Sequence, residues 1–244
     1  MTHEWRLVHS GPCSPSWNMA VDDALYRLMK LRAISPTLRL FRWSPAAVSF
    51  GRFQDTDSPE LQDYLAQGYA LVRRPTGGLA VLHAGDLSYA MVGVPGESGF
   101  ATSTRGLYRQ AHEALQSALT SLGSRPELYT GGEERSTSGL CNAMPMRSDL
   151  ILAGGKKIGG SAQVRGERAV LQHGVIHVPD GVDIDRLEEE VPQAFERTLG
   201  LRFAEAILSP AELELATCLA QQKYSSDEWN LHGRDSEDAD GCHG

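Results

Sequence analysis

Residues that could bind an oxygen-rich or anionic ligand are concentrated in the stretch RRPTGGLAVLHAGD, from Arg73 to Asp86. Arg73 and Arg74 place two positive charges just before a Thr76-Gly77-Gly78 turn. Glycine lacks a Cβ, so the backbone amides of such a turn can approach a ligand closely. Guanidinium and amide N–H groups together suit an anionic or oxygen-rich head group. Taken alone, a Thr-Gly-Gly sequence is also typical of a plain hairpin turn.

Cys141 is a candidate nucleophile because it follows a polar, glycine-rich segment, 124–139, of the kind that presents functional residues on loops. A cysteine forms a thiolate near neutral pH when a positive charge lies beside it. Lys156 and Lys157 begin the next conspicuous segment and could supply that charge. The alternative is an inert cysteine that packs as a small hydrophobic residue.

Lys157 precedes four small residues, which would let a large ligand lie against this part of the chain. They are Gly159, Gly160, Ser161 and Ala162. A lysine beside such a groove can donate a hydrogen bond to a carbonyl group or exchange a proton with the ligand. An exposed, solvated lysine is the alternative interpretation.

Two histidines, His83 and His173, follow apolar strand-like runs and could orient a ligand. A hydrogen-bonded structural role is open for each. We find no supported Ser-His-Asp pattern, no P-loop and no clustered metal ligands, so we expect no metal site. The four cysteines are far apart and lack CxxC spacing, which is typical of free thiols in a cytoplasmic protein.

Apolar periodicity and turn residues predict the elements that must position these side chains. Strands are expected over residues 5–9, 37–43, 47–50, 69–73, 79–83, 87–94, 149–153, from 156 onward and 170–178. Helices are expected after Ser14, over 59–67 and 106–122, as two short helices separated by Pro192, and from Ser209. The glycine turn therefore follows a strand, where a ligand could bind. In the first helix we expect Asn18, Asp22 and Asp23 on the surface.

The composition is that of an ordinary globular protein, with 244 residues, 41% hydrophobic and 22% charged. A net charge of −8 argues against an extended nucleic-acid surface. No apolar run could span a bilayer, and the N-terminus lacks the apolar region of a signal peptide. We therefore expect no nucleic-acid or membrane partner. The predicted architecture is one α+β domain over residues 1–230, monomeric, with a disordered acidic tail over 231–244.

Three blocks of sequence, RRPTGGLAVLH, KIGGSAQ and QHGVI, resemble in order and spacing those of the lipoate-protein ligase and octanoyltransferase superfamily. The similarity extends to WNMAVDDAL at 17–25, to the 41–54 segment and to KYSSDEWN at 223–230. It implies a mixed β-sheet flanked by helices, as in biotin-protein ligase catalytic domains.

Within this superfamily the chain most resembles the cysteine-type octanoyltransferases, because Cys141 stands eight residues before the acidic Asp149. The resemblance implies that Cys141 accepts an octanoyl group from acyl carrier protein and that Lys157 is the active-site lysine. The acceptor would be a lysine of a lipoyl domain, such as glycine cleavage H protein, and no cofactor would be needed. The expected substrate-binding residues are Arg73, Arg74, Thr76, Gly77, Gly78, His83, Gly159, Gly160, Ser161, Ala162 and His173.

Two positions depart from the family pattern. Leu79 follows the glycine turn where the transferases often carry arginine. The turn before Lys156 is one residue longer than usual, which leaves open whether Lys156 or Lys157 faces the site. An alternative function is an ATP- and Mg²⁺-dependent lipoate ligase working through a lipoyl-adenylate, in which Cys141 would be incidental. A third is a non-enzymatic relative that binds acyl groups or carrier domains.

Overall fold

The computed structural model describes residues 3–131 and 145–235. The expected nucleophile Cys141 and the second half of the 124–139 segment lie outside the described residues. Among the described helices, none is both long and apolar enough to cross a membrane.

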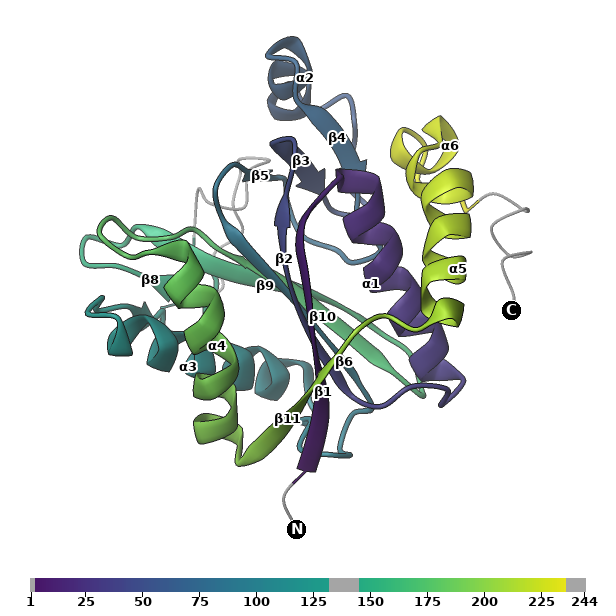
Figure 1. The fold of residues 1–244 in the computed structure, drawn as a ribbon. Coiled ribbons are helices and arrows are strands. Elements are labelled where there is room, and N and C mark those ends of the chain that lie inside the picture. The colour runs from purple at the N-terminus through teal and green to yellow at the C-terminus, as the bar shows by residue number, and fades with distance from the viewer. Residues whose placement is uncertain (1–2, 132–144, 236–244) are drawn as a thin grey trace.

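Two β-sheets form the centre of the described chain (Figure 1). The large sheet has the order β11-β1-β2-β6-β10-β9-β8-β7. Its strands, in that order, are Leu201–Ala206, His3–Cys13, Thr37–Trp43, Leu87–Gly93, Val170–Ile176, Lys157–Arg165, Leu150–Ile151 and Glu127–Leu128. The strand β1 pairs in parallel with β2 and β11, whereas β2, β6, β10 and β9 pair antiparallel. The small sheet has the order β4-β3-β5, with strands Ala70–Arg73, Ala47–Phe50 and Val81–His83.

Helices cover both faces of the large sheet (Figure 1). They are α1 (Pro15–Lys30), α2 (Pro59–Ala66), α3 (Thr104–Ser121), α4 (Ile184–Leu199), α5 (Pro210–Leu219), the π-helix η2 (Ala220–Tyr224) and α6 (Asp227–Asn230). One apolar core lies between the sheet and α3 and α4, and a second lies between its other face and α1 and α5. A third, smaller core joins α2 to the small sheet. The predicted mixed sheet flanked by helices is confirmed.

Side-chain caps begin two of these helices where the sequence predicts them. The Ser14 hydroxyl accepts a hydrogen bond from the amide of Trp17, and Pro15 occupies the first turn. In α5, Ser209 and Glu212 form a reciprocal capping box. Such caps satisfy amide groups that the first turn of a helix leaves without partners.

The predicted break at Pro192 is wrong, because α4 is one helix from Ile184 to Leu199. A proline removes one intrahelical hydrogen bond. Here Leu187, Val191 and Phe195 are fully buried against the sheet, and this burial outweighs the lost bond. The strand β11 was not predicted, because its half-polar sequence LRFAEA forms a strand only by pairing with β1.

The expected tail does not begin at residue 231. The Leu231 carbonyl accepts a hydrogen bond from Arg73 at 3.1 Å, and Asp235 pairs with Lys223 at 2.6 Å. Residues 231–235 are therefore held against the fold, and residues 236–244 lie outside the described residues.

Candidate functional site

A pocket lies where α1, the small sheet and the large sheet meet. The apolar part of its lining, here called the apolar wall, is formed by Met19, Phe41, Trp43, Val81 and Val175. The rest of the lining consists of polar groups and small residues: Ser49, Arg74, Gly78, His83, Ser88, Gly160, Ser161, Ala162, His173 and Gly174. Seven of the expected substrate-binding residues thus line one cavity: Arg74, Gly78, His83, Gly160, Ser161, Ala162 and His173. A pocket lined by both apolar side chains and polar groups suits an acyl chain with a polar head.

The glycine turn extends the small sheet toward this pocket. The Arg74 amide donates to the Phe50 carbonyl and the Arg52 amide to the Thr76 carbonyl, both at 2.8 Å. Gly78 has a φ of +98°, which favours glycine. A Cβ at Gly51 would lie 1.9 Å from the Gly78 carbonyl oxygen, so the turn packs directly on the backbone of the neighbouring segment.

Arg74 braces this turn from the pocket side. Its Nη1 donates to Ser49 Oγ at 2.8 Å, and its Nη2 donates to the carbonyls of Gly77 and Leu79 at 3.1 and 3.0 Å. The guanidinium is buried and lines the pocket. Gly77 itself does not line it, although its carbonyl holds Arg74 in place.

Arg73, expected beside the ligand, points away from the pocket. Its guanidinium donates to the carbonyls of Trp229, Arg52 and Gln54 at 2.7 to 2.9 Å, and its carbonyl accepts from Trp229 Nε1 at 2.8 Å. Neighbouring residues of an extended chain project to opposite sides, which separates Arg73 from Arg74. Arg73 therefore anchors the C-terminal segment to the small sheet.

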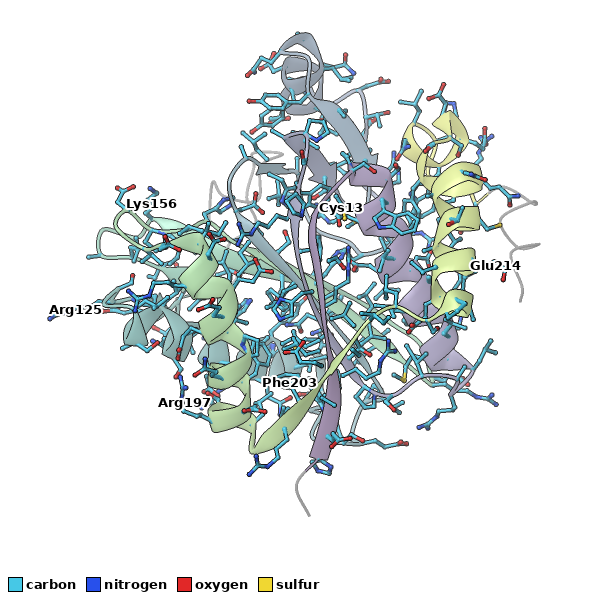
Figure 2. The ribbon with its side chains drawn as sticks, viewed as in Figure 1. Cys13, Arg125, Lys156, Arg197, Phe203 and Glu214 are labelled. Carbon is cyan, nitrogen blue, oxygen red and sulfur yellow. The ribbon has the colours of Figure 1, made fainter. Side chains whose placement is uncertain are left out.

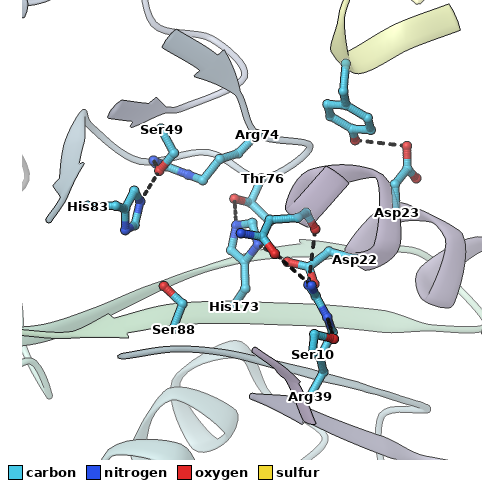
Figure 3. Close-up of polar contacts among 12 residues, drawn as sticks. Ser10, Asp22, Asp23, Arg39, Ser49, Arg74, Thr76, His83, Ser88 and His173 are labelled. Carbon is cyan, nitrogen blue, oxygen red and sulfur yellow. Dashed lines mark hydrogen bonds and ion pairs between the residues drawn. The ribbon is translucent and has the colours of Figure 1, made fainter. Parts of the chain in front are cut away.

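A buried chain of polar contacts connects His173 to the first helix (Figure 3). His173 Nε2 lies 2.6 Å from Thr76 Oγ1, and its Nδ1 lies 3.0 Å from Asp22 Oδ2. Burial lowers the pKa of His173, and Asp22 opposes that shift. Thr76 does not line the pocket but ties the glycine turn to this chain.

The chain continues from Asp22 to Arg39, whose Nη1 lies 2.8 Å from Asp22 Oδ1. Arg39 also donates to Asn18 Oδ1 and to Ser10 Oγ, each at 2.8 Å. Asn18, Asp22 and Arg39 are completely buried, so the expected surface position of the helix polar residues is wrong. Polar groups are buried when they satisfy one another, which helical periodicity cannot reveal.

Asp23, the other expected surface residue, pairs with the C-terminal block. It accepts from Lys223 Nζ at 3.1 Å and from the Tyr224 hydroxyl at 3.0 Å. The Lys223 ammonium also lies 4.0 Å from the centre of the Trp229 ring. The residues of the KYSSDEWN segment thus hold η2 and α6 against α1 and β4.

Lys157, and not Lys156, faces the interior. The Lys157 ammonium lies 2.7 Å from Asp149 Oδ2, and both residues are buried, whereas Lys156 is exposed at the outer end of the β8–β9 hairpin (Figure 2). Strand β9 bulges here, because Leu150 pairs with Gly159 while Ile151 pairs with Lys157. Bulges redirect side chains, and this one brings Lys157 beside Gly160 on the pocket wall.

The adjacent glycines of β9 differ in their surroundings. A Cβ at Gly160 would meet the end of Lys157, whereas one at Gly159 would meet Leu150 in the core. Gly159 therefore does not line the pocket.

His112, not singled out from the sequence, hydrogen-bonds to Ser161 Oγ at 3.1 Å and to the Ser148 carbonyl.

His83 contacts Ser49 and Asp86, two contacts that the sequence did not predict. Its Nε2 lies 2.7 Å from Ser49 Oγ and its Nδ1 lies 2.8 Å from Asp86 Oδ2. The sequence alone shows no supported Ser-His-Asp pattern, because Ser49 reaches His83 only through the β3–β5 pairing, whereas His83 and Asp86 are three residues apart in the chain. Burial lowers the pKa of His83, and Asp86 opposes this shift.

Among the described residues, no cluster of His, Cys, Asp and Glu side chains could hold a metal ion.

Comparisons with known proteins agree with this architecture. The model of the lipoyl protein ligase A/B catalytic domain matches residues 14–195. The octanoyltransferase LipM of Kyrpidia tusciae is 32% identical, with 93% of this chain and 98% of the relative aligned. LipM of Bacillus subtilis is 29% identical over 93% of this chain and 97% of its own length.

Solved structures of lipoate-protein ligases share the fold of this chain. A lipoate-protein ligase A bound with ATP superposes with a TM-score of 0.78 at 26% identity, covering 96% of this chain and 100% of its own. A putative lipoate protein ligase from T. acidophilum with bound lipoic acid has a TM-score of 0.76 at 26% identity, covering 95% and 99%. The chain belongs to the lipoyl protein ligase A/B catalytic-domain family.

Proposed function

We propose that this octanoyltransferase of lipoate biosynthesis acts in two steps through a thioester on Cys141. In the first step the Cys141 sulfur attacks the octanoyl thioester of acyl carrier protein, and the carrier thiol leaves with a proton. In the second step a lysine amine of a lipoyl domain, such as that of glycine cleavage H protein, attacks the new thioester. An amide forms, and the Cys141 thiol is released.

The observation that carries this proposal is the buried Lys157–Asp149 pair, which lies against Gly160 of the pocket lining. Asp149 stands eight residues after Cys141. A fixed ammonium group near a cysteine favours its thiolate form and can polarise the carbonyl under attack. Asp149 would hold that ammonium in one orientation.

The apolar wall supports an acyl substrate. Each buried methylene group contributes roughly 0.8 kcal/mol, so an eight-carbon chain against Met19, Phe41 and Val175 would be bound well and its length would be measured. Arg74 and the Gly78 segment lie at the same pocket, where their positive and N–H groups would stabilise negative charge on the carbonyl oxygen.

A thioester is already activated, so the proposed reaction needs neither ATP nor Mg²⁺. The alternative function is an ATP-dependent lipoate ligase, which the similarity to a ligase bound with ATP supports. In that case the enzyme would form a lipoyl-adenylate, and Cys141 would be dispensable. We further propose that the protein works in the cytoplasm as a monomer.

Intact-protein mass spectrometry tests the proposal. After incubation with octanoyl-acyl carrier protein and no ATP, the wild-type protein should gain one octanoyl group that hydroxylamine removes. The Cys141→Ala protein should gain none and should not transfer octanoate to a lipoyl domain. Transfer that requires ATP and Mg²⁺ and persists in Cys141→Ala would establish the ligase instead.

A further inference from the structure

Ser49, His83 and Asp86 form a hydrogen-bonded series at the pocket. Ser49 Oγ lies 2.7 Å from His83 Nε2, as Figure 3 shows, and His83 Nδ1 lies 2.8 Å from Asp86 Oδ2. Ser49 and His83 both line the pocket. The three residues thus have the mutual geometry of a nucleophile, a base and the group that orients the base.

The partners define how the protons are arranged. A carboxylate only accepts hydrogen bonds, so His83 carries its proton on Nδ1 and presents a bare Nε2 to Ser49. The Ser49 hydroxyl donates to that nitrogen and accepts from Arg74 Nη1 at 2.8 Å. Burial favours the neutral imidazole by lowering the pKa of His83. Ser49 is therefore placed to lose its proton to a base while a guanidinium stabilises the developing oxyanion.

The surroundings hold the imidazole in this orientation. Its ring stacks on Trp43, with centroids 4.0 Å apart, and Trp43 Nε1 donates to Ser88 Oγ at 2.9 Å. Ser88 in turn donates to Asp86 Oδ2 at 3.2 Å. Among the described residues, Asp86 Oδ1 is buried without a hydrogen-bond partner. A buried carboxylate oxygen without a hydrogen-bond partner destabilises the fold, and such groups often occur at functional sites.

We propose that Ser49 is a second acyl-accepting nucleophile, which hydrolyses medium-chain acyl thioesters and esters without Cys141. Ser49 Oγ and His83 lie at the same pocket as the apolar wall formed by Met19, Phe41 and Val81. The acyl chain that this wall accommodates would place its carbonyl carbon within reach of Ser49.

The reaction has two steps. In the first, Ser49 Oγ forms a bond to the carbonyl carbon, its proton moves to His83 Nε2, and the thiol or alcohol leaves with that proton. In the second, water attacks the serine ester, gives a proton to His83 and releases the carboxylic acid, and the proton returns to Ser49 Oγ. Asp86 stabilises the imidazolium in both steps. This activity limits the time that an acyl group spends in the pocket when no acceptor amine is present.

An octyl fluorophosphonate tests the nucleophile directly, because it modifies activated serines. The full-length protein should gain one phosphonyl group that peptide mapping assigns to Ser49. Ser117→Ala, which changes a serine on α3 outside the pocket, is the matched control and should be labelled as fast as wild type. Ser49→Ala should not be labelled. No labelling of the wild type, or labelling elsewhere, overturns the proposal.

Asp86→Asn provides a second test that keeps the Ser49 hydroxyl. An amide can donate to His83 Nδ1 and favour the wrong tautomer, so labelling should slow by roughly 100-fold or more. In the Cys141→Ala background, hydrolysis of p-nitrophenyl octanoate should fall by a similar factor with Asp86→Asn and disappear with Ser49→Ala. Equal thermal unfolding of the variants would show that the fold is intact. Labelling of Asp86→Asn at the wild-type rate would show that the hydrogen bonds among Ser49, His83 and Asp86 have only a structural role. Since these measurements bypass Cys141, their failure would leave the two-step transfer untouched.

Discussion

Gly160→Ala should displace the Lys157 ammonium without changing any charged residue. A Cβ at position 160 would lie 2.8 Å from Lys157 Cε, 3.0 Å from its Nζ and 3.3 Å from Asp149 Oδ1. Favourable contacts between carbon atoms are roughly 3.5–4.0 Å long. The end of the lysine side chain must therefore move by about 1 Å, away from the position that it shares with Asp149.

Catalysis should be far more sensitive to this movement than stability. A displacement of about 1 Å in a positioned group can reduce a rate roughly 100-fold. The unfolding free energy should change little, because only the flexible end of Lys157 moves and alanine is favoured over glycine inside a strand by roughly 0.5–1 kcal/mol. Single-turnover transfer from octanoyl-acyl carrier protein to a lipoyl domain measures the catalytic rate. Urea unfolding measures the unfolding free energy.

Gly159→Ala is the matched control, because a Cβ there would point to Leu150 in the core and not to Lys157. Its Cβ would lie 3.1 Å and 3.2 Å from two atoms of Leu150 and 3.4 Å from the Val175 carbonyl oxygen. Crowding of a packed core costs about 1–3 kcal/mol, so this variant should lose stability while its folded fraction keeps most of its transfer rate. Wild-type transfer by Gly160→Ala would refute the assignment of Lys157 to the site.

Three further predictions follow from other contacts. Lys157→Ala should slow both half-reactions. Lys156→Ala should transfer at nearly the wild-type rate, since Lys156 is exposed. Reversed phenotypes in the same assay would contradict the register observed between β8 and β9. Asp22→Asn should lower the urea-unfolding free energy by about 3–5 kcal/mol, because it leaves the buried Arg39 guanidinium without a countercharge; Glu97→Gln, in an exposed ion pair, is the control and should change little. Burial lowers the pKa of His83, His112 and His173, so the unfolded chain binds more protons than the folded one below about pH 6.5. The unfolding free energy should therefore fall as the pH decreases through that range, by at most about 1.4 kcal/mol per pH unit for each histidine; a flat profile between about pH 7.5 and 5.5 would contradict the buried, neutral state of these rings.

Much of the fold was predictable because it depends on short-range patterns. The bounds of β2 and β3, the Ser14 cap and the Ser209–Glu212 capping box all follow from residues adjacent in the chain. The glycine turn and the small residues after Lys157 indicated the pocket for the same reason, since close approach requires residues without bulky side chains. The family resemblance rested on these local blocks as well.

The tertiary structure alone decided which polar groups meet. Asp22 and Arg39 are buried only because α1 packs over β2 and each satisfies the other. Ser49 reaches His83 because β3 pairs antiparallel with β5, a register that neither segment encodes by itself. A single bulge in β9 turned Lys157 rather than Lys156 inward. Strand pairing, bulges and mutual burial depend on residues distant in sequence, and for that reason local composition and periodicity could not reveal them.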